Sequence, residues 1–106
     1  MARIVFMGSP DFAVPSLRAL NAAHTVAGGI TQRYRPAGGG RELRAPAVKV
    51  EAVRTGLPCI QPERTNTPEV LETIAEWHPD VVIVAAFGQL LRPALLDLPP
   101  HGCVNV

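Results

Sequence analysis

Residues 80–86, DVVIVAA, are apolar at every position after the first aspartate. Such an uninterrupted run is typical of a parallel strand that helices cover on both faces, whereas a strand with one face in water would alternate. A second run, RIVFM at residues 3–7, has the same character and ends at Gly8-Ser9-Pro10. These two segments predict the centre of a parallel sheet.

Segments with strand and helix character alternate on either side of these two runs. Thr67-Pro68 supplies an N-cap and a first helical residue, His78-Pro79 would stop that helix, and Gly56 would end another in the left-handed conformation. The pattern predicts strands at 3–7, 25–31, 57–60, 80–86 and 102–106, a helix after Pro10 with Phe12, Leu17 and Leu20 on its apolar face, and helices at 45–56, 67–77 and 93–96.

This alternation indicates an α/β fold with a doubly wound, mainly parallel, Rossmann-like sheet, because parallel strands are joined by right-handed crossovers. In the simplest arrangement the first strand lies beside the strand at 80–86. Ligands bind such sheets at the carboxyl ends of the strands where the order reverses, here the loops that begin at Gly8 and Ala86. The first loop has one glycine in place of the GxGxxG pattern, so a dinucleotide-binding domain is disfavoured.

The composition fits one small globular domain. Of the 106 residues 47% are apolar but only 5% aromatic, the balance of an aliphatic sheet under Ala- and Leu-rich helices. The longest apolar run, residues 81–87, is far shorter than the roughly 18 to 20 residues that cross a bilayer, and no secretory signal is visible. Cys59 and Cys103 lack the spacing of a zinc site or a disulfide framework. We expect a cytoplasmic monomer with reduced, part-buried thiols, no metal and no membrane partner.

Positive charge is concentrated in one segment, although the net charge of the chain is only +1. A Pro-Ala-Gly-Gly-Gly run at 36–40 lies inside this segment and favours a mobile loop, because glycine restricts the backbone little. We predict a basic loop at about residues 32–46 that meets a polyanion, the alternative being a solvated loop without a partner. Between residues 32 and 49 the chain has five cations and one acid: Arg33, Arg35, Arg41, Arg44, Lys49 and Glu42.

Four segments occur in a distinctive order: GSPDFAVPSL at 8–17, RPAGGGRELRAPAVK at 35–49, VVIVAAFGQLLRP at 81–93, and GCVNV at 102–106. Together they closely resemble the methionyl-tRNA formyltransferase family. The resemblance spans nearly the whole chain but only the amino-terminal part of the longer family protein. It implies an incomplete formyltransferase fold, with the carboxy-terminal domain absent. It also implies an enzyme that transfers a formyl group from 10-formyltetrahydrofolate to the methionine amine of initiator methionyl-tRNA.

The resemblance further implies roles for particular residues. The basic segment would contact the tRNA acceptor stem, and the segment after the strand at 80–86 would hold the folate pterin, mostly through its main chain. Asn105 matches the asparagine of the family's Asn-x-His motif, which polarises the formyl oxygen, while the histidine that assists proton transfer would be residue 107. The assigned residues are Asn105 as catalytic, Phe87, Gly88, Gln89, Leu90 and Leu91 as cofactor-binding, and Arg35, Arg41, Arg44 and Lys49 as RNA-binding.

Other interpretations stay open at this point. The pterin segment could be an ordinary strand-to-helix loop, and Ser9 with Asp11 is better explained as an N-cap and first helical turn than as a nucleophile and an acid. The competing functions are a formyltransferase acting on a nucleotide-sugar amine, which the basic segment disfavours, and a folate- or RNA-binding module without catalysis. Because the family's histidine and downstream aspartate lie beyond these residues, we expect the chain alone to be inactive. The remaining histidines are expected to be surface or capping residues: His24, His78 and His101.

Overall fold

The computed structural model describes residues 2–33, 35–36, 43–85, 87 and 91–106. Its main feature is a five-stranded sheet in the order β5-β2-β1-β6-β7, in which every neighbouring pair is parallel. The predicted α/β class and the placement of the first strand beside the strand at 80–86 are therefore confirmed. The strands of this sheet are β1 (Arg3–Gly8), β2 (Thr25–Ile30), β5 (Cys59–Ile60), β6 (Val81–Ala85) and β7 (Cys103–Asn105).

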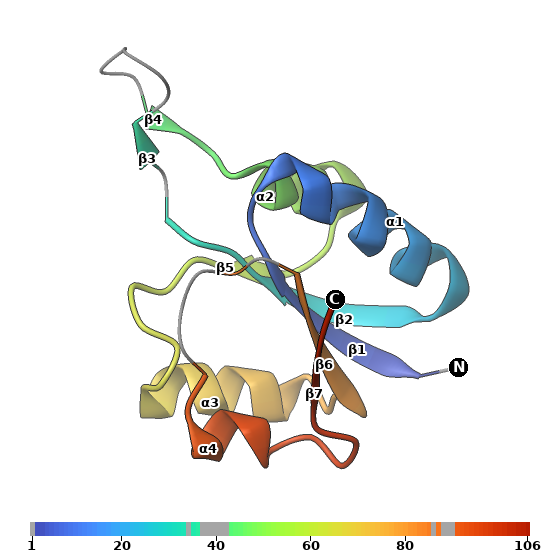
Figure 1. Ribbon diagram of the computed structural model, residues 1–106, viewed down its shortest axis with the longest axis vertical. Coiled ribbons are helices and arrows are strands. Elements are labelled where there is room, and N and C mark those ends of the chain that lie inside the picture. The colour runs from blue at the N-terminus through green and yellow to red at the C-terminus, as the bar shows by residue number, and fades with distance from the viewer. Residues whose placement is uncertain (1, 34, 37–42, 86, 88–90) are drawn as a thin grey trace.

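Helices cover both faces of the sheet, as Figure 1 shows. Helices α1 (Val14–Ala23) and α2 (Ala47–Thr55) lie on one face, and α3 (Pro68–Glu76) and α4 (Pro93–Leu96) on the other. Side chains of β1 alternate between the two layers, because successive residues of a strand point to opposite faces. One core holds Ile4, Phe6, Ala13, Leu17, Val26, Val48 and Ala85; the other holds Val5, Met7, Ile30, Val70, Ile74, Val82, Val84, Phe87 and Leu95.

The helix boundaries follow local capping chemistry. The Thr67 hydroxyl accepts a hydrogen bond from the Val70 amide at 3.4 Å, and Pro68 occupies the first turn of α3. Gly56 ends α2 in the left-handed conformation, with φ at 72°. The predictions at these three positions are confirmed.

The start of the first helical region differs from the prediction. Residues Asp11–Ala13 form a 3-10 turn before α1, and Phe12 is 70% exposed instead of lying on the apolar face. The prediction that Ser9 acts as an N-cap is also wrong, because its hydroxyl accepts a hydrogen bond from the Gln32 amide at 2.8 Å. Side chains in a 3-10 turn point in different directions from those in an α-helix. The α-helical spacing counted from Phe12 to Leu17 therefore does not place Phe12 on the apolar face.

Trp77, directly after α3, packs against the sheet at a glycine. A Cβ atom built at Gly28 would lie 2.4 Å from the Trp77 ring, so this strand position must lack a side chain for α3 to approach. The ring therefore occupies the space that any other residue in β2 would fill. The sequence alone gave no reason for the two glycines of β2. The structure gives a reason for Gly28, which leaves room for the Trp77 ring.

The basic segment contains a short antiparallel pair that the sequence did not predict. Strands β3 (Arg35–Pro36) and β4 (Leu43–Arg44) pair through Arg35 opposite Arg44 and project away from the main sheet. Residues 34 and 37–42, which belong to the segment expected to be a mobile loop, lie outside the described residues. Within the part of the chain that is described, no helix has the length and apolar character needed to span a membrane.

Candidate active site at the carboxyl edge of the sheet

The strand order reverses between β1 and β6, and Asn105 lies close to that point. Val84 pairs in register with Met7 on one side and with Asn105 on the other, so Asn105 ends β7 beside the carboxyl end of β6. The Val106 amide donates a hydrogen bond to the Val84 carbonyl at 2.8 Å and extends this ladder by one residue. Asn105 itself is exposed. The expected placement of Asn105 at this edge is therefore observed.

The central strands come unusually close where the first loop begins. A Cβ atom at Gly8 would lie 2.7 Å from the Ala85 carbonyl oxygen and 2.9 Å from the Phe6 ring. Any side chain here would push β1 and β6 apart at the switch point. Gly8 thus serves close packing at the edge where ligands bind in sheets of this kind.

Gln32, two residues beyond the end of β2, joins the loops that follow four strands. Its backbone amide donates to the Ser9 hydroxyl, which follows β1, and its side-chain amide donates to the Phe87 carbonyl, which follows β6. The Gln61 side chain, after β5, donates to the Gln32 carbonyl at 3.1 Å. Sequence reasoning missed Gln32. The available signal was its position: it is a polar residue just past a strand that ends at the binding edge.

The structure describes two of the five predicted pterin-binding residues. Phe87 is 2% exposed and its side chain belongs to the core beneath α3 and α4, while Leu91 is half-buried against the same core. Both side chains thus pack against that core. Gly88, Gln89 and Leu90 lie outside the described residues.

The predicted RNA-binding residues are described only in part. Arg35 and Arg44 are neighbours across the β3–β4 pair, whereas Arg41 lies outside the described residues. Lys49 is half-buried in α2. Burial raises the pKa of the Cys59 thiol, and the positive charge of Lys49 offsets part of that rise. Lys49 therefore lies within electrostatic reach of the sheet edge at β5.

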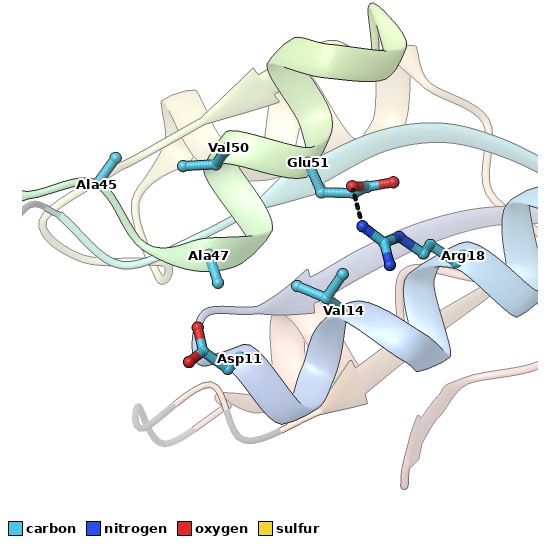
Figure 2. Close-up of a pocket in the computed structure, with 7 residues that line it drawn as sticks. All are labelled: Asp11, Val14, Arg18, Ala45, Ala47, Val50 and Glu51. Carbon is cyan, nitrogen blue, oxygen red and sulfur yellow. Dashed lines mark hydrogen bonds and ion pairs between the residues drawn. The ribbon is translucent and has the colours of Figure 1, made fainter.

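A hollow of about 330 Å³ opens between the first turns of α1 and α2, at the foot of the β3–β4 pair. At its inner end the Arg18 guanidinium reaches across from α1 to the Glu51 carboxylate at 3.1 Å, as Figure 2 shows. Arg54 also donates to this carboxylate, at 2.7 and 3.1 Å. The hollow is lined by Asp11, Val14, Arg18, Ala45, Ala47, Val50 and Glu51.

Hydrogen bonds from two arginines hold the Glu51 carboxylate in its charged form. They lower its pKa from an ordinary value of 4.5 to about 2, with the Arg54 hydrogen bond as the largest cause and the Arg18 hydrogen bond as the next. The carboxylate is nearly inaccessible, whereas both arginine side chains are more than half exposed. This group joins α1 to α2, and two of its members, Arg18 and Glu51, belong to the lining of the hollow.

The three histidines lie away from the carboxyl edge. Each precedes a strand: His24 comes before β2, His78 before β6 and His101 before β7, which places them toward the amino ends of a parallel sheet. His24 caps α1, and its Nδ1 accepts a hydrogen bond from the Ala2 amide at 3.0 Å. His78 adopts a positive φ of 50° before Pro79, and His101 is exposed. The predicted surface and capping roles agree with these positions.

Comparison with known proteins identifies the class of protein. A sequence model described as formyl transferase matches residues 2–106, so the chain belongs to the formyl transferase family. Among its curated relatives, methionyl-tRNA formyltransferase from Chloroflexus aggregans is 51% identical over 105 residues, which are 98% of this chain and 34% of that protein. Methionyl-tRNA formyltransferase from Bacillus subtilis is 49% identical over 107 residues, with 100% and 34% covered. The resemblance inferred from the four segments is confirmed.

Two solved structures of formyltransferases share this fold. Phosphoribosylglycinamide formyltransferase from Streptococcus pneumoniae aligns with a TM-score of 0.71 at 17% identity, over 99% of this chain and 56% of that one. Glycinamide ribonucleotide transformylase 1 from Geobacillus kaustophilus aligns with a TM-score of 0.69 at 20% identity, over 99% and 57%. These likenesses establish the fold. The chain spans about a third of the length of the curated relatives it matches.

Proposed function

We propose that this chain forms the amino-terminal part of an enzyme that transfers a formyl group from 10-formyltetrahydrofolate to the methionine amine of initiator methionyl-tRNA. The observation that carries the proposal is identity of about half over essentially the entire chain to relatives named for that activity. The solved structures of lower identity, named for a glycinamide nucleotide substrate, bear on the fold alone.

The proposed reaction is transfer between two nitrogen atoms. The methionine amine forms a bond to the formyl carbon, the bond from that carbon to N10 of the folate breaks, and a proton leaves the amine as one reaches N10. The intermediate carries negative charge on the formyl oxygen, so a hydrogen-bond donor aimed at that oxygen lowers the barrier. Asn105, exposed at the end of β7, is the residue we assign to this task.

The donor and the RNA are assigned to different sides of the carboxyl edge. We assign the pterin to the segment from Phe87 to Leu91, which leaves β6 next to Asn105 and whose two described side chains pack inward. We assign the acceptor stem to the basic segment between β2 and α2, where phosphate contacts would come from Arg35, Arg41, Arg44 and Lys49. Arg33 at the entrance of that segment pairs with Glu63 at 3.7 Å. Both side chains are more than half exposed, so water screens this pair.

The proposal is tested with a chimera in which residues 1–106 replace the matching part of the Bacillus subtilis methionyl-tRNA formyltransferase. We expect the chimera to formylate methionyl-tRNA with 10-formyltetrahydrofolate as donor, and the 106-residue chain to show no detectable turnover. General acid-base help alone is worth roughly 10²- to 10⁴-fold, and confinement of the reacting amine adds to it. A folded chimera that formylates a nucleotide-sugar amine but not methionyl-tRNA would replace the proposal by its main alternative. A folded chimera that binds folate or RNA without turnover would favour a binding module.

A further inference from the structure

The two helical layers that cover the sheet carry opposite charge. The layer formed by α1 and α2, called here the α1–α2 layer, has three cations and one acid, a balance of +2: Arg18, Lys49, Arg54 and Glu51. Helices α3 and α4 have three acids, all exposed, and no cation, a balance of −3: Glu69, Glu72 and Glu76. Because the field at a surface follows its summed charge, a polyanion is attracted to the α1–α2 layer and repelled by α3.

Positive charge on the α1–α2 layer is exposed and held in place. The buried Glu51 carboxylate accepts hydrogen bonds from Arg18 and Arg54, whose side chains are 61% and 63% exposed. Two guanidinium groups share one carboxylate, so one positive charge of this group stays uncompensated. Each guanidinium has five N–H donors; within the described part of the chain, Arg18 gives one to Glu51 and Arg54 gives two. The other donors can bind an anion, and less side-chain entropy is lost because the carboxylate already fixes both arginines.

The hollow between α1 and α2 connects this group to the basic segment. Arg18 lies at one end of the hollow and Asp11 at the other, with apolar side chains between them (Figure 2). Its lining includes Ala45, the residue that follows Arg44 of β4. The β3–β4 pair leaves the sheet on this side and projects away from α3 and α4 (Figure 1). The basic segment and the two arginines therefore lie along the same side of the molecule.

We propose that the α1–α2 layer is a second RNA-contacting surface, in which Arg18 and Arg54 bind phosphates of the RNA that the basic segment also meets. The inference rests on the proposed function and extends the RNA contacts beyond that segment. The occupant is the sugar-phosphate backbone, because charge complementarity selects it and phosphate contacts position a nucleic acid without reading its sequence. The phosphates lie at the Arg18 end of the hollow, since the Asp11 carboxylate at the other end repels them.

The first experiment measures the affinity of the chimera for initiator tRNA without its amino acid, by filter binding over a range of salt concentrations. Arg18→Gln and Arg54→Gln each remove one charge from the α1–α2 layer, and Arg92→Gln removes one from an exposed arginine beside α4. Loss of one phosphate contact should lower the slope of log affinity against log salt by about 0.7 to 0.9, and affinity at low salt roughly 3- to 10-fold. Arg92→Gln should leave the slope unchanged. Equal reductions in all three variants, or none in the first two, would overturn the proposal.

A second pair of variants leaves the hydrogen bonds of Glu51 in place. Val53→Glu adds a carboxylate next to Arg54 on α2, and Ala75→Glu adds one on α3, at positions that are both exposed. We expect Val53→Glu to weaken tRNA binding roughly 3- to 10-fold at low salt, and Ala75→Glu to change it by less than about twofold. Thermal unfolding shows which variants are folded. If the arginine variants are not, this pair decides, and equal affinities of its two members would overturn the proposal.

The outcomes separate this surface from the proposed function. Formylation by the unmutated chimera tests the function, whereas tRNA binding tests the surface without turnover. Formylation by that chimera, with unchanged tRNA affinity in the Arg18, Arg54 and Val53 variants, would overturn the surface alone and leave the layer to another partner, such as a basic-patch-binding acidic protein. Weaker binding in these variants, without formylation by any chimera, would support the surface and overturn the function. A chimera that neither formylates nor binds tRNA would overturn both.

Discussion

The centre of the sheet and its outer strand differ sharply in burial. All residues of β1 after Arg3 are buried, whereas Val104 and Asn105 in β7 are exposed. Yet the strand we assign to the chemistry is the outer one. The difference teaches that the buried centre of this chain provides a stable reference, and that main-chain pairing of β7 with β6 holds the Asn105 side chain beside it.

Pairing with β6 is what positions the outer strand. Three register pairs join them, and main-chain hydrogen bonds from His101 to Asp80 at 2.9 Å and from Val82 to Gly102 at 3.0 Å begin the ladder.

The Cys103 thiol packs inward, 3.8 Å from the Leu95 carbonyl, and burial raises its pKa. The free, half-buried state expected for both cysteines is thus observed. Because the centre of the sheet is buried, we expect substitutions there to change stability. Because Asn105 is assigned to the chemistry, we expect its substitution at the end of β7 to change activity.

The largest expected effect tests the central region. Phe6→Ala removes a fully buried ring from the core beneath α1 and α2, and should lower the free energy of unfolding by about 3 to 5 kcal/mol. Phe12→Ala is the control, because that ring is 70% exposed and its loss should change stability by no more than about 0.5 kcal/mol. Urea unfolding of both variants measures the difference. Similar losses for the two phenylalanines would contradict the contrast drawn here.

The next effect tests the outer strand. Asn105→Ala in the chimera should reduce kcat by roughly 10²- to 10³-fold, the range for loss of one donor to an oxyanion. In the 106-residue chain, the same substitution should change the free energy of unfolding by no more than about 0.5 kcal/mol, because the side chain is exposed there. Val104→Ala, on the same strand, should leave kcat nearly unchanged. A fully active Asn105→Ala chimera would remove the catalytic assignment from this strand.

The same contrast separates what the sequence could predict from what it could not. The central strands were predictable because a strand buried on both faces needs an apolar residue at nearly every position, which RIVFM and DVVIVAA supply. The ends of α3 were predictable because Thr67-Pro68 and His78-Pro79 act on their immediate neighbours. Asn105 was assignable through the family resemblance, since one polar residue between valines does not specify a reaction.

Contacts between distant residues escaped prediction. Gln32 meets Ser9 across 23 residues and Phe87 across 55, so no local pattern marks it. The local sequence shows only the possible partner of Glu51 three residues on, Arg54, whereas its second partner Arg18 is 33 residues away in another helix. The side chains at the candidate site depend on which loops the sheet brings together. Their partners therefore follow from topology, which the periodicity of a single segment does not contain.

A smaller effect tests how closely helices approach the sheet. Gly28→Ala should destabilise the chain by about 1 to 3 kcal/mol, because its Cβ would overlap the Trp77 ring at 2.4 Å. Gly29→Ala is a matched neighbour: its Cβ would meet Leu57 at 3.5 Å, an ordinary contact, and should leave stability unchanged or slightly raised. Thermal unfolding compares the two. Equal destabilisation would show that β2 rejects any side chain at these positions, whether or not Trp77 covers it.

The smallest effect concerns the helix pair over the central strands and depends on pH. The folded-state pKa of Glu51 is about 2, below its ordinary 4.5, so its ion pairs stabilise the fold above about pH 4.5 and lose that contribution as the pH falls toward 2. Glu51→Gln abolishes this titration, so the stability advantage of the parent over the variant should be greatest above pH 4.5 and shrink through that window. The effect is small because water screens both arginines, which are more than half exposed. Urea unfolding from pH 2 to 6, with exposed Glu76→Gln in α3 as control, measures it. An advantage that grows on acidification would mean that the Glu51 carboxylate does not join α1 to α2 in its charged form.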